Sequence, residues 1–276
     1  MNTTTNTKKL IESALFIAMA TVLSVIKILE LPYGGSVTLA SMLPIVLISY
    51  RNGVLWGLSS GLVYGVVQQL LGLKNLTYVS TWQSVLAVIL LDYLFAFAVI
   101  GLAGAFRKVI KSQNASLAVG AACASVIRYL FHVVSGATVW AGLSIPDKAA
   151  LIYSLGYNAT YMIPETLVLV VAAYYLGSLL DFRSDRPMRL VSDARTEGKM
   201  LRFFGWFLIS GAVVFDVMTL FGKLQNAETG EFDFSGLSSL SNFNLISIAV
   251  VTVLAVAVAA VLFIYAAKKK EEKTAE

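Results

Sequence analysis

The feature that most constrains the fold of this chain is a series of eight apolar segments. Most approach the roughly 20 residues that a helix needs to cross a bilayer. They lie at about residues 10–30, 37–50, 53–72, 82–106, 116–141, 152–181, 203–221 and 243–267. The composition agrees, because 58% of the residues are hydrophobic and only 13% are charged, against roughly 25% charged residues in soluble domains. The sequence predicts an all-α, polytopic membrane protein.

The first two segments carry local signals of their own. The N-terminus, MNTTTNTKKL, is short and polar, and no small-residue cleavage site follows the first segment. This pattern predicts a retained first helix and not a signal peptide. The second segment is short and contains Pro44, which predicts a broken or tilted helix there.

The basic residues predict the orientation in the membrane. With the N-terminus inside, sixteen of the 21 lysines and arginines fall on the inner side, and the outer loops hold only Lys74, Lys148 and Lys223. This bias follows the positive-inside rule and agrees with an even number of spans. We therefore expect a multi-pass protein of the cell membrane with both termini in the cytoplasm. No basic patch interleaves with aromatic residues, so the lipid bilayer is the expected surroundings and no nucleic acid is an expected partner.

A charged stretch divides the chain. Residues 183–202, RSDRPMRLVSDARTEGKMLR, read as a cytoplasmic linker. We expect residues 1–182 to form a six-helix membrane domain and residues 203–276 a two-helix C-terminal extension. Asp216 is the only intramembrane charge of that extension.

The polar residues of the six-span part gather between residues 128 and 165, RYLFHVVSGATVWAGLSIPDKAALIYSLGYNATYMIPE. This stretch holds the only histidine, His132, together with Asn158 and Glu165. Polar groups are costly in hydrocarbon unless they have partners, so they usually turn inward and usually serve a function. The stretch is the first candidate for a ligand site, although a lone histidine can also be structural.

Two acids and one arginine are expected at a similar depth. Asp92 and Tyr93 lie well inside the fourth segment, Arg128 in the fifth and Glu165 in the sixth. This set predicts one structural ion pair, between Arg128 and Glu165, and one spare carboxylate, Asp92, for a cationic ligand.

Two motifs of small residues favour close helix packing. Glycines at 53, 57, 61 and 65 form one face of the third segment, which indicates a neighbouring backbone. Ala14 and Ala18 form a second small-residue pair on the first segment. Their spacing is compatible with packing inside the bundle or with docking to a partner helix.

Catalytic and cofactor motifs are missing from the sequence. There is no HExxH, no GxSxG and no ATP-binding motif, and one histidine cannot form a multi-histidine metal site. A single cysteine, Cys123, excludes a disulfide within the chain. No cofactor, metal or catalytic residue is expected, and energised transport would need the ATPase of another protein.

Four motifs, taken in order, carry a family resemblance: LPYGGSVTLASMLPIVLISYRNG, LLDYLFAFAVIGLAG, RYLFHVVSGATVWA and YSLGYNATYMIPE. With them, residues 8–182 resemble the thiamine-specific substrate-binding subunit, or S component, of energy-coupling factor transporters. The resemblance implies a six-helix bundle with a thiamine pocket near the outer face. It also implies a transmembrane coupling protein with two ATPase subunits, docked on the face of Ala14 and Ala18.

The resemblance also implies the residues that bind thiamine. These are Asp92, Tyr93, His132, Trp140, Tyr153 and Asn158. Three departures stand out: the acid is Asp92 where the family is expected to carry glutamate, the first outer loop offers Tyr33 and no tryptophan, and the last two segments have no counterpart. Trp82 is a candidate to replace the missing tryptophan of the lid.

Other functions remain open at this point. The chain could be an S component for another vitamin or for a thiamine precursor. A membrane-embedded hydrolase would use His132 with Asp92 or Glu165, but no second nucleophile is evident beside them. A stand-alone channel is disfavoured by the compact helices rich in glycine and aromatic residues.

Overall fold

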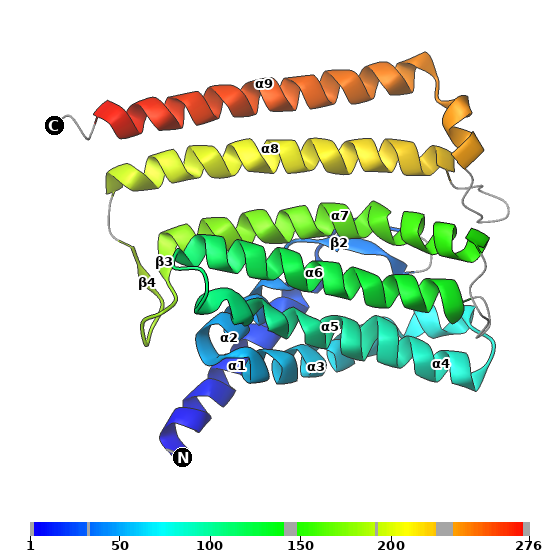
Figure 1. The fold of residues 1–276 in the computed structure, drawn as a ribbon, viewed down its shortest axis with the longest axis horizontal. Coiled ribbons are helices and arrows are strands. Elements are labelled where there is room, and N and C mark those ends of the chain that lie inside the picture. Colours follow the sequence, from blue (N-terminus) through cyan, green and yellow to red (C-terminus); the bar gives the residue numbers. More distant parts are fainter. Residues whose placement is uncertain (1–2, 32–33, 141–147, 191–192, 225–233, 273–276) are drawn as a thin grey trace. The chain divides into compact units, whose positions relative to one another are not determined.

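The structure is a computed structural model of the chain and describes residues 3–31, 34–140, 148–190, 193–224 and 234–272. Within these residues, six helices are long and apolar enough to cross a membrane (Figure 1). They are Val54–Leu71, Trp82–Arg107, Gln113–Thr138, Lys148–Leu179, Met200–Phe221 and Asn242–Lys268. They match the third to eighth predicted segments, and the prediction of a helical polytopic membrane protein is confirmed.

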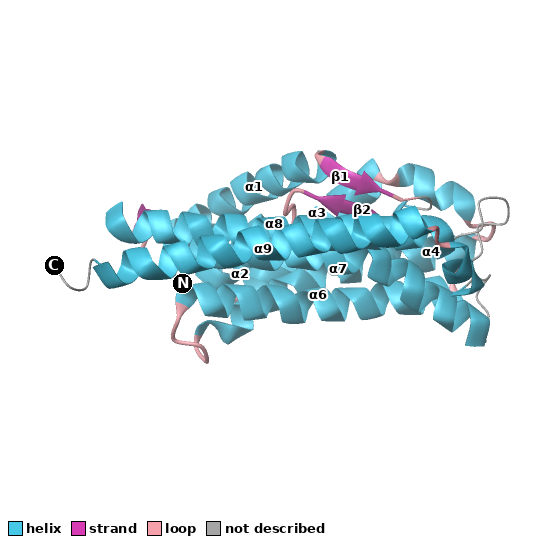
Figure 2. Cartoon of the chain, turned by 90° about the horizontal axis from the view of Figure 1, so that it is seen from above, coloured by secondary structure: helices cyan, strands magenta, loops and turns pink. Residues whose placement is uncertain are grey.

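The first predicted segment ends earlier than expected. Helix α1 (Thr3–Val25) is followed by strand β1 (Lys27–Glu30), which pairs in antiparallel fashion with β2 (Ser36–Thr38), as Figure 2 shows. The prediction of one span over residues 10–30 is therefore wrong in its last part. Leu29 of β1 is buried in a cluster with residues of α7, whereas the strand residues beside it are exposed. This alternation is typical of a half-buried strand.

Of the broken or tilted helix predicted at Pro44, the break is wrong. The second segment starts as β2 and turns into helix α2 (Leu43–Asn52) only after residue 42. Pro44 thus lies in the first turn of the helix. An N–H group has no partner within the helix at this position, so proline causes no break there. Leu43 to Tyr50 are all buried, which makes α2 a central element of the bundle.

The next two spans and the loop between them run from residue 54 to residue 107. Their elements are α3 (Val54–Leu71), η2 (Leu73–Tyr78), α4 (Trp82–Val88), η3 (Ile89–Phe95), α5 (Ala96–Ala98) and η4 (Val99–Arg107). The fourth span is continuous but not a regular α-helix, because η3 is π-helical and η4 is a 3₁₀-helix. π-helical turns often occur at functional sites, and η3 carries Asp92.

The glycine stripe of α3 lies against the backbone of this irregular span. A Cβ atom on Gly57, Gly61 or Gly65 would come within 2.8 Å of a carbonyl oxygen of residues 93 to 101. The packing interpretation is confirmed for these three residues. Gly53 has open space around it and a φ of +98°, so it serves the turn between α2 and α3 instead.

Helices α6 (Gln113–Thr138) and α7 (Lys148–Leu179) form the other wall of the bundle. A buried ion pair joins them, with Arg128 Nη1 2.7 Å from Glu165 Oε2. The Thr38 hydroxyl donates to the second oxygen of Glu165 at 3.0 Å, which ties β2 to the same pair. The predicted pairing of Arg128 with Glu165 is confirmed.

At one end of the bundle, the guanidinium group of Arg51 links α1, α2 and the segment that follows α7. Arg51 donates to the Glu12 carboxylate of α1 and to the backbone carbonyls of Phe182, Ser184 and Asp185. The first compact unit of the chain comprises residues 1–177 and 182–187. The segment 182–187 therefore belongs to the bundle, although it follows the last of its helices.

The second compact unit comprises residues 178–181 and 188–276. It contains β3 (Leu180–Asp181) paired with β4 (Met188–Arg189), and the helices α8 (Asp193–Leu224), η5 (Phe234–Ser239) and α9 (Asn242–Glu272). Helices α8 and α9 lie side by side (Figure 1), and the Thr252 hydroxyl donates to Asp216 at 2.6 Å across their interface. Helix α8 starts inside the segment 183–202 that the sequence analysis assigns to a linker. The stretch DARTEGKMLR is rich in helix-forming residues. Its charge led to the prediction of a linker in place of a helix.

Candidate functional site

The first unit encloses a cavity of about 720 Å³ between β1, the end of α3, η3, α6 and α7. Polar and aromatic side chains line it, although most of the surrounding helix surface is apolar. All six residues that the family resemblance implies as ligand contacts line this cavity: Asp92, Tyr93, His132, Trp140, Tyr153 and Asn158. The structure thus brings together residues from three spans that are up to 66 positions apart in the sequence.

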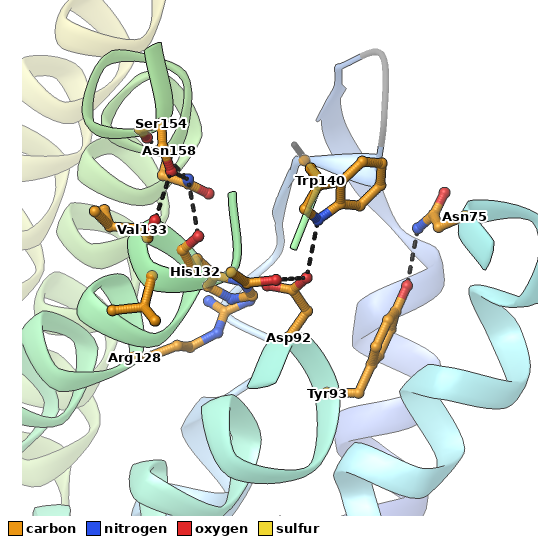
Figure 3. Close-up of polar contacts among 12 residues, drawn as sticks. Asn75, Asp92, Tyr93, Arg128, His132, Val133, Trp140, Ser154 and Asn158 are labelled. Carbon is orange, nitrogen blue, oxygen red and sulfur yellow. Dashed lines mark hydrogen bonds and ion pairs between the residues drawn. The ribbon is translucent and has the colours of Figure 1, made fainter. Parts of the chain in front are cut away.

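The Asp92 carboxylate lies at the centre of the polar contacts of the cavity (Figure 3). Its Oδ1 lies 2.8 Å from Nδ1 of His132. Its Oδ2 accepts hydrogen bonds from Ser135 Oγ at 2.6 Å and from Trp140 Nε1 at 3.2 Å. All three partners lie on α6 or just after it, so a single segment holds the carboxylate that η3 presents.

The charge of Asp92 has no lysine or arginine partner among the described residues. The nearest candidate, Arg128, also lines the cavity but is bonded to Glu165. The side chain of Asp92 is only 13% exposed. A buried carboxylate without a cation is costly unless hydrogen bonds or a bound cation compensate it. The cavity wall is therefore suited to a positively charged ligand.

His132 presents a second polar group to a ligand. Its Nδ1 faces a carboxylate, which can only accept, so in the neutral imidazole Nδ1 carries the proton and Nε2 is an acceptor. Nε2 is buried and has no hydrogen-bond partner in the described part of the chain. A buried polar atom without a partner needs an explanation, and a ligand that donates a hydrogen bond would satisfy this one.

The same geometry bears on the hydrolase hypothesis. Asp92, His132 and Ser135 are the residue types of a catalytic triad, but the Ser135 hydroxyl donates to Asp92 and not to the histidine. A serine nucleophile requires a hydrogen bond to its general base. Among the described residues no group of three or more histidine, cysteine or acidic side chains could hold a metal ion. The site therefore lacks the contacts of an activated nucleophile.

Tyr93 points away from its neighbour Asp92, towards the η2 loop (Figure 3). Its hydroxyl accepts from Asn75 Nδ2 at 2.9 Å and donates to the carbonyl of Gly72 at 3.4 Å. Tyr93 and Asn75 both line the cavity. Asp92 and Tyr93 are adjacent on η3 but line different walls of the cavity. Asp92 contacts the α6 side, and Tyr93 contacts the loop at the end of α3.

Asn158 lies at the cavity with its polar atoms already engaged. Its amide nitrogen donates to the carbonyls of Ser154 at 2.9 Å and His132 at 3.3 Å. Its oxygen accepts from the Tyr161 hydroxyl at 2.7 Å. These bonds hold α7 against α6 next to the histidine, so Asn158 shapes the site whether or not it contacts a ligand.

Aromatic rings cover the α7 side of the cavity. Tyr153 stacks on Tyr157 with centroids 5.9 Å apart and planes within 5°. Tyr157 in turn lies edge to face with Tyr161 at 5.9 Å. The sequence analysis missed Tyr157 and Tyr161, although a spacing of four residues places all three tyrosines on one helix face.

Trp82, the predicted replacement for the tryptophan of the lid, lies outside the cavity. Trp82 is 71% exposed and does not line the cavity, so the proposal that it substitutes there is wrong. Tyr78 of η2 does line it, and its ring lies 6.3 Å from that of Trp140 at an angle of 33°. Tyr33 lies outside the described residues.

Ala14 and Ala18 lie apart from the cavity, on an exposed face of α1. Large apolar side chains surround them on this face, among them Leu15 and Val22, which are more than 60% exposed. The alternative that the two alanines pack inside the bundle does not fit this exposure.

Comparisons with known proteins agree with the resemblance. A family model described as thiamine transporter protein (Thia_YuaJ) matches residues 10–181. The thiamine transporter ThiT of Bacillus subtilis is 37% identical over 182 residues, which are 62% of this chain and 91% of the relative. ThiT of Lacticaseibacillus paracasei is 25% identical over 59% of this chain and 83% of the relative. A solved structure of ThiT from Listeria monocytogenes has a TM-score of 0.50 and 25% identity, over 61% of this chain and 92% of that chain. The match to the family model ends before α8.

Proposed function

Because this chain belongs to the thiamine transporter family that matches residues 10–181, we propose that it is the thiamine-binding S component of an energy-coupling factor transporter. It takes thiamine up into the cell together with a separate ATP-driven coupling module. The family is one of transporter components, and the chain is a multi-pass membrane protein. The binding role belongs to the six-helix part, residues 1–182, and both termini lie in the cytoplasm.

One observation carries the proposal: the Asp92 carboxylate lies in a cavity of aromatic rings, and no arginine or lysine of the described segments pairs with it. Thiamine combines a permanently cationic thiazolium with a flat aminopyrimidine. The carboxylate offsets the charge, and an aromatic face adds cation–π attraction of about 0.5–2 kcal/mol. The stacked tyrosines and the ring of Trp140 provide such faces.

The edges of the ligand meet polar groups of matching character. Nε2 of His132 accepts from the amino group of the pyrimidine, since it is buried and has no partner among the residues that the structure describes. Tyr93, Tyr153 and Asn158 complete the wall and fix its shape. These roles are proposals for the six residues that line the cavity.

The energy source lies in partner subunits. The exposed face of α1 with Ala14 and Ala18 docks on a transmembrane coupling protein, because small residues allow close approach of another helix. That partner carries two ATPase subunits.

The direct test of the proposal is a titration of the purified protein with thiamine. We expect saturable binding with heat release and quenching of tryptophan fluorescence, since Trp140 lines the cavity. Purification without added vitamin, followed by mass spectrometry of any small molecule that remains bound, gives an independent answer. A titration without saturable heat or quenching would refute thiamine binding. A tighter response to another vitamin or to a thiamine precursor would move the proposal to that ligand.

The division of the chain into two parts gives a second prediction. Every residue that lines the cavity belongs to the first unit. A chain truncated after Pro187 is expected to insert, fold and bind thiamine within a few-fold of the full protein. It must keep residues 182–187, because Arg51 is bonded to their carbonyls.

A shorter truncation after residue 181 is the matched comparison for this experiment. It removes the three carbonyl acceptors of Arg51 but not the Glu12 carboxylate, and it is expected to lower the thermal stability of the bundle. If the longer truncation folds but has no thiamine affinity, the C-terminal extension takes part in binding, and the six-helix binding domain is wrong for this protein.

A further inference from the structure

Ser135 has no role in the site as described so far beyond its contact with Asp92, yet its position is specific. It lies three residues after His132 on α6, so both side chains project from the same face of the helix. Ser135 is fully buried, and its hydroxyl donates to Asp92 Oδ2 at 2.6 Å. This is the shortest of the three contacts that the carboxylate makes.

The length of the aspartate side chain makes this contact important. Asp92 stands where the family resemblance implies a glutamate, and one methylene less gives a shorter reach from η3. The Ser135 hydroxyl anchors the nearer end of the carboxylate to α6. The other oxygen is then directed towards Nδ1 of His132.

Asp92 Oδ2, the oxygen bonded to Ser135, also accepts a hydrogen bond from the tryptophan. Trp140 Nε1 shares Oδ2 with Ser135 and lies 3.2 Å away, a longer contact. Without the serine, Asp92 would keep its contacts with His132 and Trp140, but Oδ2 would lose the shorter of its two hydrogen bonds and would be held only by the longer one to the indole. The serine hydroxyl thus supports the same carboxylate oxygen that the indole of Trp140 contacts.

We infer that Ser135 is a positioning residue for the cationic part of the ligand, acting through the orientation of Asp92. The inference rests on the proposed function, because it concerns how the same cavity recognises thiamine. Charge-assisted hydrogen bonds are among the strong ones. The selectivity of the site for a cation over a neutral molecule of the same shape therefore depends on a serine that need not touch the ligand.

The test is a double-mutant cycle on the full chain, with thiamine binding measured by calorimetry. Ser135→Ala is expected to weaken binding about ten- to a hundred-and-fiftyfold, the range for a hydrogen bond to a charged group. In the Asp92→Asn background the same change is expected to cost less than about twofold, because the residue through which it acts is gone. Ser135→Thr keeps the hydroxyl and restores most of the affinity. Thr138→Val is the matched control on the same helix, since the Thr138 hydroxyl is exposed and bonded to its own backbone.

A second readout separates positioning from general damage to the fold. A thiamine isostere with an uncharged ring in place of the thiazolium is titrated against each variant. Ser135→Ala should lower the preference for thiamine over this isostere, whereas a merely structural defect lowers both affinities equally. If Ser135→Ala does not fold, Ser135→Cys replaces it, because it keeps the volume and has only a weak donor.

The outcomes distinguish this inference from the proposed function. Wild-type protein that does not bind thiamine refutes the function itself. Wild-type binding with an unaffected Ser135 variant, an unchanged preference for the cation, or losses that multiply independently in the double mutant would each overturn the role of Ser135 alone.

Discussion

Asp92→Asn is expected to weaken thiamine binding about tenfold or more while the protein stays folded. The asparagine has nearly the same shape but no charge, so the cation loses a charge-assisted contact worth about 1.5–3 kcal/mol. The amide also places an N–H donor where one carboxylate oxygen accepted a hydrogen bond. The donor at that position, from His132 or from Ser135, then loses its acceptor.

Glu165→Gln is the contrasting substitution at the same depth. Glu165 is buried, bonded to Arg128 at 2.7 Å, and accepts from Thr38. The substitution leaves the guanidinium as a buried charge without a counter-ion, and such a loss costs about 3–5 kcal/mol of stability. Nε of Arg128 already lacks a hydrogen-bond partner in the described chain, which leaves little to replace the lost partner. The expected result is a lower midpoint of thermal unfolding.

The pair of substitutions is measured by thiamine titration and by thermal unfolding of the purified proteins. Asp185→Asn is the control for the loss of one carboxylate, because the side chain of Asp185 is 99% exposed and lies outside the cavity. If Asp92→Asn binds normally while Glu165→Gln folds and fails to bind, the roles of the two acids are exchanged.

The spans of this fold could be predicted because they depend on local composition. Stretches such as residues 82–106 are apolar over their whole length, and a bilayer accepts little else. The ion pair between Arg128 and Glu165 was predictable for a related reason, since charges at one depth in hydrocarbon seek each other. Both arguments need only the sequence and the dimensions of the membrane.

The departures from the helical pattern could not be predicted in this way. Residues 27–30 form a strand because β2 and the buried cluster around Leu29 and Tyr161 are available to them. Those partners are distant in the sequence, and a hydropathy window does not contain them. The start of α2 at Leu43 was not predicted either, although proline in the first helical turn is a known signal of a helix start.

The candidate site was likewise predictable only in part. His132 and Asp92 stood out as polar residues in apolar segments, but nothing in the sequence indicated that they touch each other. Their contact joins the π-helical element η3 to α6 across 40 positions of sequence, and the π-helical geometry has no clear signature in the sequence. Ser135 and Tyr157 were missed because serine and tyrosine are ordinary residues in membrane helices, and only the three-dimensional arrangement gives them a role.

Replacement of both Ala14 and Ala18 by tryptophan is expected to abolish thiamine uptake and to leave thiamine binding in detergent intact. The two alanines lie on an exposed face of α1, away from the cavity. Small residues on such a face let a neighbouring helix approach closely, whereas two indole rings hold it away. Uptake is measured with labelled thiamine in cells that express the chain together with its coupling module, and binding is measured on the purified protein.

The control places the same two side chains, at the same spacing, on another helix. Val126 and Leu130 of α6 are 58% and 53% exposed and do not line the cavity. Tryptophan at both positions replaces exposed side chains outside the cavity, so binding and uptake are expected to persist. Loss of uptake in this control as well would show that any bulky pair on the surface disturbs the transporter. Uptake that survives the change at Ala14 and Ala18 would remove that face as the docking surface. A specific loss of uptake places the coupling protein on α1, because only there would the same added volume separate binding from transport.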